Sequence, residues 1–182
     1  MSVGQIVSTP VCLTFLDLLR WRATNEPDRR AYTFLLDGES EEVHMTYGEM
    51  DKRARAIGAL LQQNIPAGET VLLLYPSGLD YIAAFFGCLY AGVIAVPVYP
   101  PNPARLERTL PRLRGILLDA RPSVVLTTNA ILPISTKLTA HDATFAALKW
   151  LATDRLTGEE ATAWHQPQVE GNTIAFLQYT SG

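Results

Sequence analysis

The sequence contains few residues that could build a metal centre or a disulfide framework. It has 2 cysteines and 3 histidines in 182 residues. Cys12 and Cys88 lie far apart, and His44, His141 and His165 form no pair with the spacing of metal ligands. We therefore expect no metal site, free thiols with Cys88 buried, and a reducing, cytoplasmic setting.

Signals for a membrane, for secretion or for nucleic acid are also lacking. The first ten residues have neither the basic start nor the apolar run of a signal peptide. The longest apolar stretch, residues 81–98, is interrupted by Gly87, Gly92 and Pro97, so no membrane span is expected. The net charge of −3 leaves no basic excess for a nucleic-acid partner.

The common motifs of nucleotide and hydrolase chemistry are missing as well. The chain has no G-x-x-x-x-G-K-[ST], no G-x-G-x-x-G after a strand, and no G-x-S-x-G. No acid–base dyad or triad can be assembled from its residues. We therefore assign no catalytic residue to this chain.

What the sequence does contain is a regular alternation of strand and helix patterns. Residues 79–91 and 105–120 repeat apolar side chains at helical spacing, and Pro111 predicts a kink or a late start in the second helix. This alternation predicts an α/β fold, a parallel sheet with helices on both faces. Its buried strands are indicated by three apolar runs, residues 71–75, 93–98 and 123–128.

Before this unit, the pattern predicts a helix, a small β-hairpin and a second helix. Each helix begins with a capping box, Thr14 with Asp17 and Thr46 with Glu49. The hairpin pairs residues 31–37 with 41–46 across an Asp-Gly turn.

After residue 128 the pattern is weaker. It indicates a helix at 139–148, a strand at 148–153, a polar surface connection at 153–171 and a last strand at 173–180.

Three stretches are candidate functional sites. Thr180, Ser181 and Gly182 follow the last strand, where ligands of parallel sheets bind, so they form either a phosphate loop or a plain turn. Pro100 and Pro101 form either a rigid connection or a wall that closes a channel. Arg105, Arg108 and Arg112 lie on a basic helix, which is either a solvated face or a docking patch for an acidic partner or a phosphate.

Longer segments resemble a known family. FLQYTSG is similar to the opening of the adenylate-forming signature, and TYGEMDKRARAIGALLQ to the first conserved helix of that superfamily. The stretch from VLLLYPSGLDYIAAFFGCLYAGVIAVPVYPPNP to SVVLTT, and the opening TFLDLLRWRATNEPDRRAYTFLLDG, resemble the fatty acyl-AMP ligases.

This resemblance implies an enzyme that uses ATP and Mg²⁺ to turn a fatty acid into acyl-AMP. The acyl group would then pass to the phosphopantetheine arm of an acyl carrier protein, in polyketide, nonribosomal peptide or lipid biosynthesis. Thr180, Ser181 and Gly182 would hold phosphates, Pro100 and Pro101 would exclude coenzyme A, and Arg105, Arg108 and Arg112 would dock the carrier. An acyl-CoA ligase and a non-catalytic carrier-binding module remain alternatives.

The same resemblance implies the domain organisation. Residues 1–182 correspond to the N-terminal subdomain of the adenylation domain, cut within the phosphate loop and without the C-terminal domain. We expect such a chain to be inactive by itself.

Overall fold

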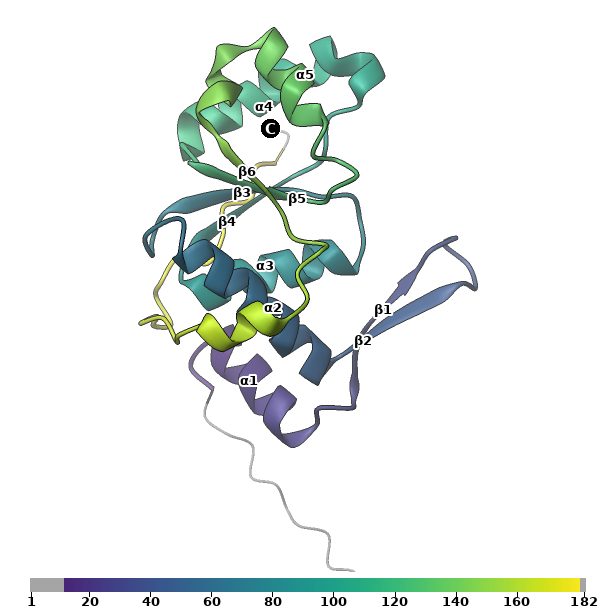
Figure 1. The fold of residues 1–182 in the computed structure, drawn as a ribbon, viewed down its shortest axis with the longest axis vertical. Helices are drawn as coiled ribbons and strands as arrows, with labels where there is room; N and C mark the ends of the chain where they lie inside the picture. Colours follow the sequence, from purple (N-terminus) through teal and green to yellow (C-terminus); the bar gives the residue numbers. More distant parts are fainter. Residues whose placement is uncertain (1–11, 181–182) are drawn as a thin grey trace, which may run out of the picture.

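The computed structural model describes residues 12–180 and shows a parallel sheet between two layers of helices (Figure 1). Helices α4 and α5 cover one face, and α2 and α3 cover the other, with α1 outside them. This confirms the predicted α/β class. The helices are α1 (Phe15–Asn25), α2 (Tyr47–Gln62), α3 (Leu79–Ala91), α4 (Leu106–Ala120) and α5 (Ile134–His141), and the strands are β1 (Arg30–Leu35), β2 (Glu42–Thr46), β3 (Thr70–Leu74), β4 (Ile94–Val98), β5 (Val124–Thr127) and β6 (Lys149–Ala152).

Both capping boxes form as expected. The Thr14 hydroxyl accepts the N–H of Asp17, and the Asp17 carboxylate accepts the N–H of Thr14. Thr46 and Glu49 make the same reciprocal pair at the start of α2. Each pair satisfies donors that the helix itself leaves without partners, and this is why the sequence signature locates both helix starts.

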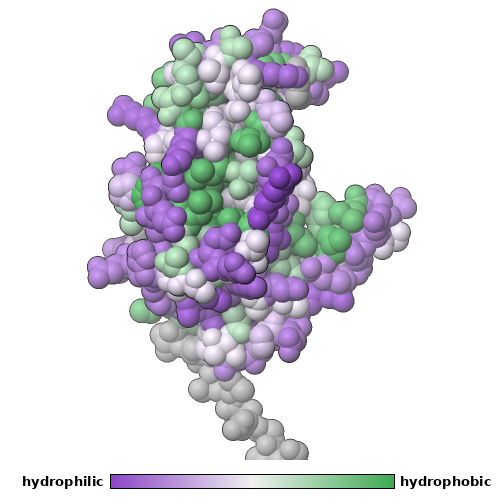
Figure 2. Space-filling view, in the orientation of Figure 1, coloured by the Kyte–Doolittle hydropathy of each residue, from purple (hydrophilic) through white to green (hydrophobic). Residues whose placement is uncertain are grey.

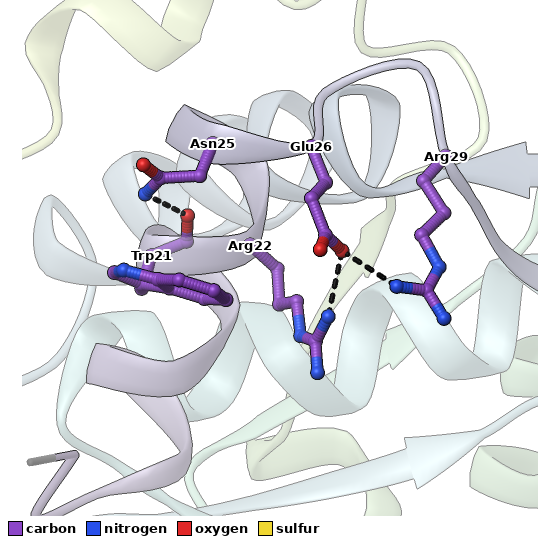
Figure 3. Close-up of polar contacts among 5 residues, drawn as sticks. All are labelled: Trp21, Arg22, Asn25, Glu26 and Arg29. Carbon is purple, nitrogen blue, oxygen red and sulfur yellow. Dashed lines mark hydrogen bonds and ion pairs between the residues drawn. The ribbon is translucent and has the colours of Figure 1, made fainter. Parts of the chain in front are cut away.

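Helix α1 ends in a small polar cluster (Figure 3). The Glu26 carboxylate accepts hydrogen bonds from Arg22 at 2.6 Å and from Arg29 at 3.0 Å. Within the last turn, the Asn25 amide donates to the carbonyl of Trp21 at 2.8 Å. These side chains tie the end of α1 to the chain that enters β1.

The predicted hairpin is confirmed, and it projects from the body (Figure 1). At its turn, one Asp37 oxygen accepts the backbone N–H groups of Glu39, Ser40 and Glu41, which holds the pKa of Asp37 well below its usual range. Figure 2 shows an apolar area on the projecting hairpin with polar surface at its tip, and Leu36 is 53% exposed.

The large sheet has the strand order β4-β3-β5-β6, and all its neighbours are parallel. The chain steps from β3 outward to β4 and then crosses back to β5 on the other side of β3. The crossover helices α3 and α4 therefore lie on opposite faces, and the strand order reverses between β3 and β5. Such a switch point, at the carboxyl ends of the strands, is where α/β sheets bind ligands.

Gly87 allows α3 to pack unusually closely on α2. A Cβ built at this position would lie 2.6 Å from Cβ of Ile57, well inside van der Waals contact. Both helices bury their apolar stripes in one cluster with β3, and Cys88 is fully buried there. The expectation of a buried Cys88 is confirmed, and both cysteines are free thiols.

Helix α4 runs through Pro111 without interruption, so the alternative of a late start there was wrong. The helix begins at Leu106, directly after a 3-10 turn, η1 (Pro103–Arg105), in which the Asn102 side chain accepts the N–H of Ala104. Pro111 is exposed, so its ring faces solvent and its missing N–H leaves one carbonyl of the preceding turn without its helical donor.

The helix expected at 139–148 was wrong in its bounds. Helix α5 ends at His141, because Asp142 is extended and its carboxylate accepts the N–H of Thr144. That contact caps a separate 3-10 turn, η2 (Ala143–Ala147), in which Phe145 is buried. A side chain that caps locally competes with helix continuation, and here it wins.

The stretch 153–171 is more than a surface connection. It contains a 3-10 turn, η3 (Glu159–Ala163), and Trp164 packs on Tyr90 with 5.3 Å between ring centroids. The Trp164 indole N–H donates to the Tyr90 carbonyl at 2.7 Å, and Arg20 lies over the indole ring. This segment therefore covers the outer side of α2 and α3.

The last expected strand, 173–180, does not form a ladder. Its contact with the sheet is a single parallel bridge between Ala95 and Phe176. The Ala95 N–H donates to the Ala175 carbonyl, and the Ala95 carbonyl accepts from Leu177. The next donor toward this side of β4 would be residue 97, which is proline and has no N–H, so the ladder stops there.

Candidate functional site

The switch point between β3 and β5 is closed by a side chain. Tyr75 follows β3, and its phenol forms a 2.7 Å hydrogen bond with the Thr153 hydroxyl beyond β6, so it reaches past the end of β5. Both residues are buried, and burial raises the pKa of the Tyr75 phenol despite the bond to Thr153. Beneath them, the Thr127 hydroxyl donates to the Leu74 carbonyl. One pocket at this edge lies on the side of β3 and β4.

A pocket of about 200 Å³ opens there, at the carboxyl ends of β3 and β4. Its polar groups are neutral: phenols, one hydroxyl and one amide. It can therefore bind and orient a ligand by hydrogen bonds and ring contacts, but its lining supplies no ionised acid or base. The lining residues are Tyr75, Pro76, Ser77, Tyr81, Pro97, Val98, Tyr99 and Gln178.

The chain passes from this pocket directly to Thr180. Burial alternates along the segment: Leu177 and Tyr179 pack on the α4 side, whereas Gln178 lines the pocket. Phe176, on the other face, meets Phe85 of α3 with 5.6 Å between ring centroids. By the same alternation Thr180, which is exposed, shares the face of Phe176 and Gln178.

Helix α4 contacts the residue before Thr180 twice. The Tyr179 phenol donates to the Asp119 carboxylate, and this bond raises the pKa of Tyr179 to about 12. The Arg112 guanidinium donates to the Tyr179 carbonyl at 3.3 Å. The structure thus ties the basic helix to the predicted phosphate loop, a link that the sequence pattern did not reveal.

The other predicted site residues are distributed as follows. Pro101 is buried and Pro100 half-buried, so the Pro-Pro pair packs against the protein, whereas Tyr99 before it is 80% exposed. Arg108 is exposed on α4, the helix of Arg112, whereas Arg105, also exposed, ends the 3-10 turn η1 before it, so the expectation that all three lie on one helix was wrong for Arg105. Ser181 and Gly182 lie outside the described residues.

Sequence reasoning missed the lining of the pocket and the contacts of Tyr179. Tyr75 and Ser77 could have been found, because they directly follow a buried parallel strand. Asp119 carries no such signal, since it lies on the exposed side of an amphipathic helix.

Within residues 12–180, no group of three or more His, Cys, Asp or Glu side chains comes together in a way that could hold a metal ion. In the same range, no helix has both the length and the apolar composition needed to cross a membrane.

The strand order of the parallel sheet reverses between β3 and β5, a neutral pocket lies at the carboxyl ends of the strands, and the hydroxyl of Thr180 follows there. These features are typical of α/β domains that hold nucleotides or phosphates. The model of the AMP-binding enzyme family matches residues 19–182. The chain therefore belongs to the AMP-binding enzymes.

Individual relatives agree with this assignment. The medium-chain-fatty-acid–[acyl-carrier-protein] ligase JamA of Moorena producens is 44% identical over 177 residues, which are 97% of this chain and 30% of JamA. The long-chain-fatty-acid–AMP ligase FadD32 of Mycobacterium marinum is 36% identical over 159 residues, 85% of this chain and 25% of FadD32. The chain thus spans less than a third of these relatives.

A solved structure shows the same fold. The fatty acyl-adenylate ligase of Legionella pneumophila, in complex with acyl adenylate and pyrophosphate, superposes with a TM-score of 0.81 and 36% identity. The match covers 94% of this chain and 29% of that chain. The described fold is therefore the fold of part of a fatty acyl-adenylate ligase.

Proposed function

We propose that the protein carrying this chain activates a fatty acid with ATP and Mg²⁺ and transfers it to an acyl carrier protein. The observation that carries this proposal is the 44% identity to JamA over 97% of the chain. Residues 1–182 would then form the N-terminal subdomain of a cytoplasmic adenylation domain that serves polyketide, nonribosomal peptide or lipid biosynthesis.

The chemistry proceeds in two steps. An oxygen of the fatty-acid carboxylate attacks the α-phosphorus of ATP, and the bond to the β-phosphate breaks, which gives acyl-AMP and pyrophosphate. A phosphopantetheine thiolate then attacks the acyl carbonyl, and AMP leaves. The carboxylate alone is a poor electrophile, so the first step makes the second possible.

In this scheme the segment that begins at the exposed Thr180 binds phosphate. The Thr180 and Ser181 hydroxyls and the backbone N–H groups through Gly182 would hold the β- and γ-phosphates while negative charge shifts toward the leaving pyrophosphate. The neutral pocket beside Gln178 would bind an uncharged part of a substrate. For this role, no side chain of the pocket needs to gain or lose a proton.

The choice of acyl acceptor is the sharpest test of the proposal. Purified protein in its longest natural form is given fatty acid, ATP and Mg²⁺, and then either coenzyme A or a holo acyl carrier protein. We expect acyl transfer to the carrier and little to coenzyme A. Efficient formation of acyl-CoA would instead identify an acyl-CoA ligase.

The role of the Pro-Pro pair can be tested in the same assay. Because Pro101 is buried, its replacement would also disturb packing, so Pro100→Ala is the better variant. If the pair excludes coenzyme A, this variant forms more acyl-CoA than the wild type, with unchanged transfer to the carrier. Unchanged acyl-CoA formation would reduce the pair to a rigid connection.

A second candidate is a module that binds a carrier without catalysis. The observation in its favour is the exposure of Arg105 and Arg108 at the start of α4. Titration with an acidic carrier protein should then show binding that weakens in about 0.5 M salt and in the variant Arg105→Met/Arg108→Met. Carrier binding together with adenylate formation would favour the ligase.

A further inference from the structure

We propose that helix α4 positions the phosphate-binding segment: Arg112 and Asp119 hold Tyr179 and thereby set where Thr180 lies. This inference rests on the proposed function, since Thr180 binds phosphate only if the protein binds ATP. It makes Arg112 a positioning residue, although its side chain is exposed like those of Arg105 and Arg108.

The sheet by itself cannot position Thr180. Its backbone bonds to the segment end with Leu177, whose N–H donates to the Ala95 carbonyl at 2.9 Å. Pro97 would be the next donor on that edge of β4 and has no N–H, so the sheet offers Leu177 and the residues after it no further ladder. A segment held at one bridge would pivot about that bridge.

Helix α4 supplies the contacts that the strand lacks. Leu177 and Tyr179 pack against the apolar cluster that α4 forms with the sheet. The Tyr179 phenol donates to Asp119, and Arg112 donates to the Tyr179 carbonyl, so both the side chain and the backbone of Tyr179 are fixed. These two contacts span one face of α4, seven positions from Arg112 to Asp119, which is two helical turns.

Both contacts involve an ionised group, and the bond from Tyr179 to Asp119 is the stronger of the two because the Arg112 contact is 3.3 Å long. The two contacts are also directional: the Asp119 carboxylate accepts the O–H of Tyr179, and the Arg112 guanidinium donates an N–H to the Tyr179 carbonyl. Thr180 directly follows Tyr179 in the sequence, so no further residue lies between it and the residue that α4 holds. Loss of either contact therefore changes the distribution of Thr180 positions, while the pocket residues other than Gln178 lie outside this segment.

The test uses the longest natural chain that contains these residues, with the variants Tyr179→Phe, Asp119→Asn and Arg112→Met. Tyr179→Phe keeps the ring and removes the hydroxyl. We expect KM for ATP in adenylate formation to rise about tenfold, with KM for the fatty acid unchanged. Arg112→Lys keeps a donor and should restore part of the loss. Amide hydrogen exchange of the peptide covering residues 176–180 should become about tenfold faster in each variant.

A double-mutant cycle distinguishes positioning from general damage. Because Tyr179 and Asp119 share one hydrogen bond, the double variant should be no worse than either single variant. The matched controls are Lys137→Met and Glu107→Gln. They remove one positive and one negative charge, as Arg112→Met and Asp119→Asn do, but at exposed positions elsewhere. They should keep the wild-type KM for ATP and the wild-type exchange rate.

The outcomes separate this inference from the function on which it rests. Failure of the wild type to form any adenylate would overturn the proposed function, and the exchange rates would still decide whether α4 holds the segment. Unchanged exchange at 176–180 in all three variants would refute the positioning role, whatever the activity. Equal rises in KM for both substrates would refute it too, because they would indicate general damage.

Discussion

At the scale of single residues, the missing side chain of Gly87 determines how closely α2 and α3 pack. A methyl group there would meet Ile57, which is itself buried, so the helices would have to separate. We expect Gly87→Ala to lower the free energy of unfolding by about 1–3 kcal/mol. Denaturant titration measures this change.

The matched control is Gly115→Ala in α4. Nothing lies within 4 Å of a Cβ built at Gly115. Because alanine restricts the unfolded chain and favours helix, this variant should be more stable by about 0.5–1 kcal/mol. Equal stabilisation of Gly87→Ala and Gly115→Ala would show that helix propensity, and not the contact with Ile57, decides the effect at Gly87.

Because of buried phenols and a buried thiol, the stability of the folded chain should fall at alkaline pH. Burial raises the pKa of Tyr75, Tyr90 and Cys88, so the folded chain keeps protons that the unfolded chain releases. Their stabilisation is therefore complete below the unfolded pKa values, about 8.5 for the thiol and about 10 for the phenols, and is lost progressively above them.

We expect Tyr75→Phe to flatten this loss. Each such group contributes a slope of about 1.4 kcal/mol per pH unit above its unfolded pKa, and the variant removes one. Unfolding free energies measured from pH 8 to about pH 11 give the slope. Leu73→Val, at a buried position without a proton to release, should shift the whole curve and leave its slope unchanged. Parallel curves for Tyr75→Phe and the wild type would contradict this account.

At the scale of elements, the sequence predicts those whose determinants are local. Two capping boxes, a glycine stop at Gly92 in the left-handed conformation and three runs of buried strand residues are all readable within a few positions. Whether residues 173–180 form a strand depends on the neighbouring strand β4, whose Pro97 has no N–H to continue the ladder. The bounds of α5 depended on Asp142, whose carboxylate caps the next turn instead of pointing to solvent.

Pro111 allows a prediction about helix α4. It lies five positions after the first residue of the helix, where a residue with an N–H would donate to the carbonyl of Glu107. We expect Pro111→Ala to stabilise the protein by about 1–2 kcal/mol, since the regained bond exceeds the added entropy of the unfolded chain. Thermal or denaturant unfolding measures the change.

Pro133→Ala is the control for this prediction. Pro133 is exposed and directly precedes the first residue of α5, a position whose backbone N–H has no acceptor within the helix. Its replacement should change the stability by less than about 0.5 kcal/mol. A gain of equal size in both variants would attribute the effect to proline in general and not to its position inside α4.

At the scale of the whole molecule, the candidate site joins residues that are distant in sequence. The Tyr179–Asp119 bond spans 60 positions and the Arg112–Tyr179 bond spans 67. The location of Thr180 at the carboxyl edge of a parallel sheet could be predicted, because the rule concerns strand ends. The closure of the switch point by Tyr75 could not, because it requires the spatial order of β3, β5 and β6.

The same view leads to a prediction about the isolated chain of 182 residues. Its pocket between β3 and β4 has a neutral lining, residues 12–180 hold no group of three His, Cys, Asp or Glu side chains, and the chain spans 30% of JamA. With fatty acid, ATP and Mg²⁺, we expect it to give no acyl hydroxamate in the presence of hydroxylamine, because developing charge would lack its electrostatic partners. The longest natural chain should give product under the same conditions. ATP-dependent hydroxamate from the 182-residue chain would contradict this prediction, and would mean that Thr180, Ser181 and Gly182 suffice to stabilise the leaving pyrophosphate.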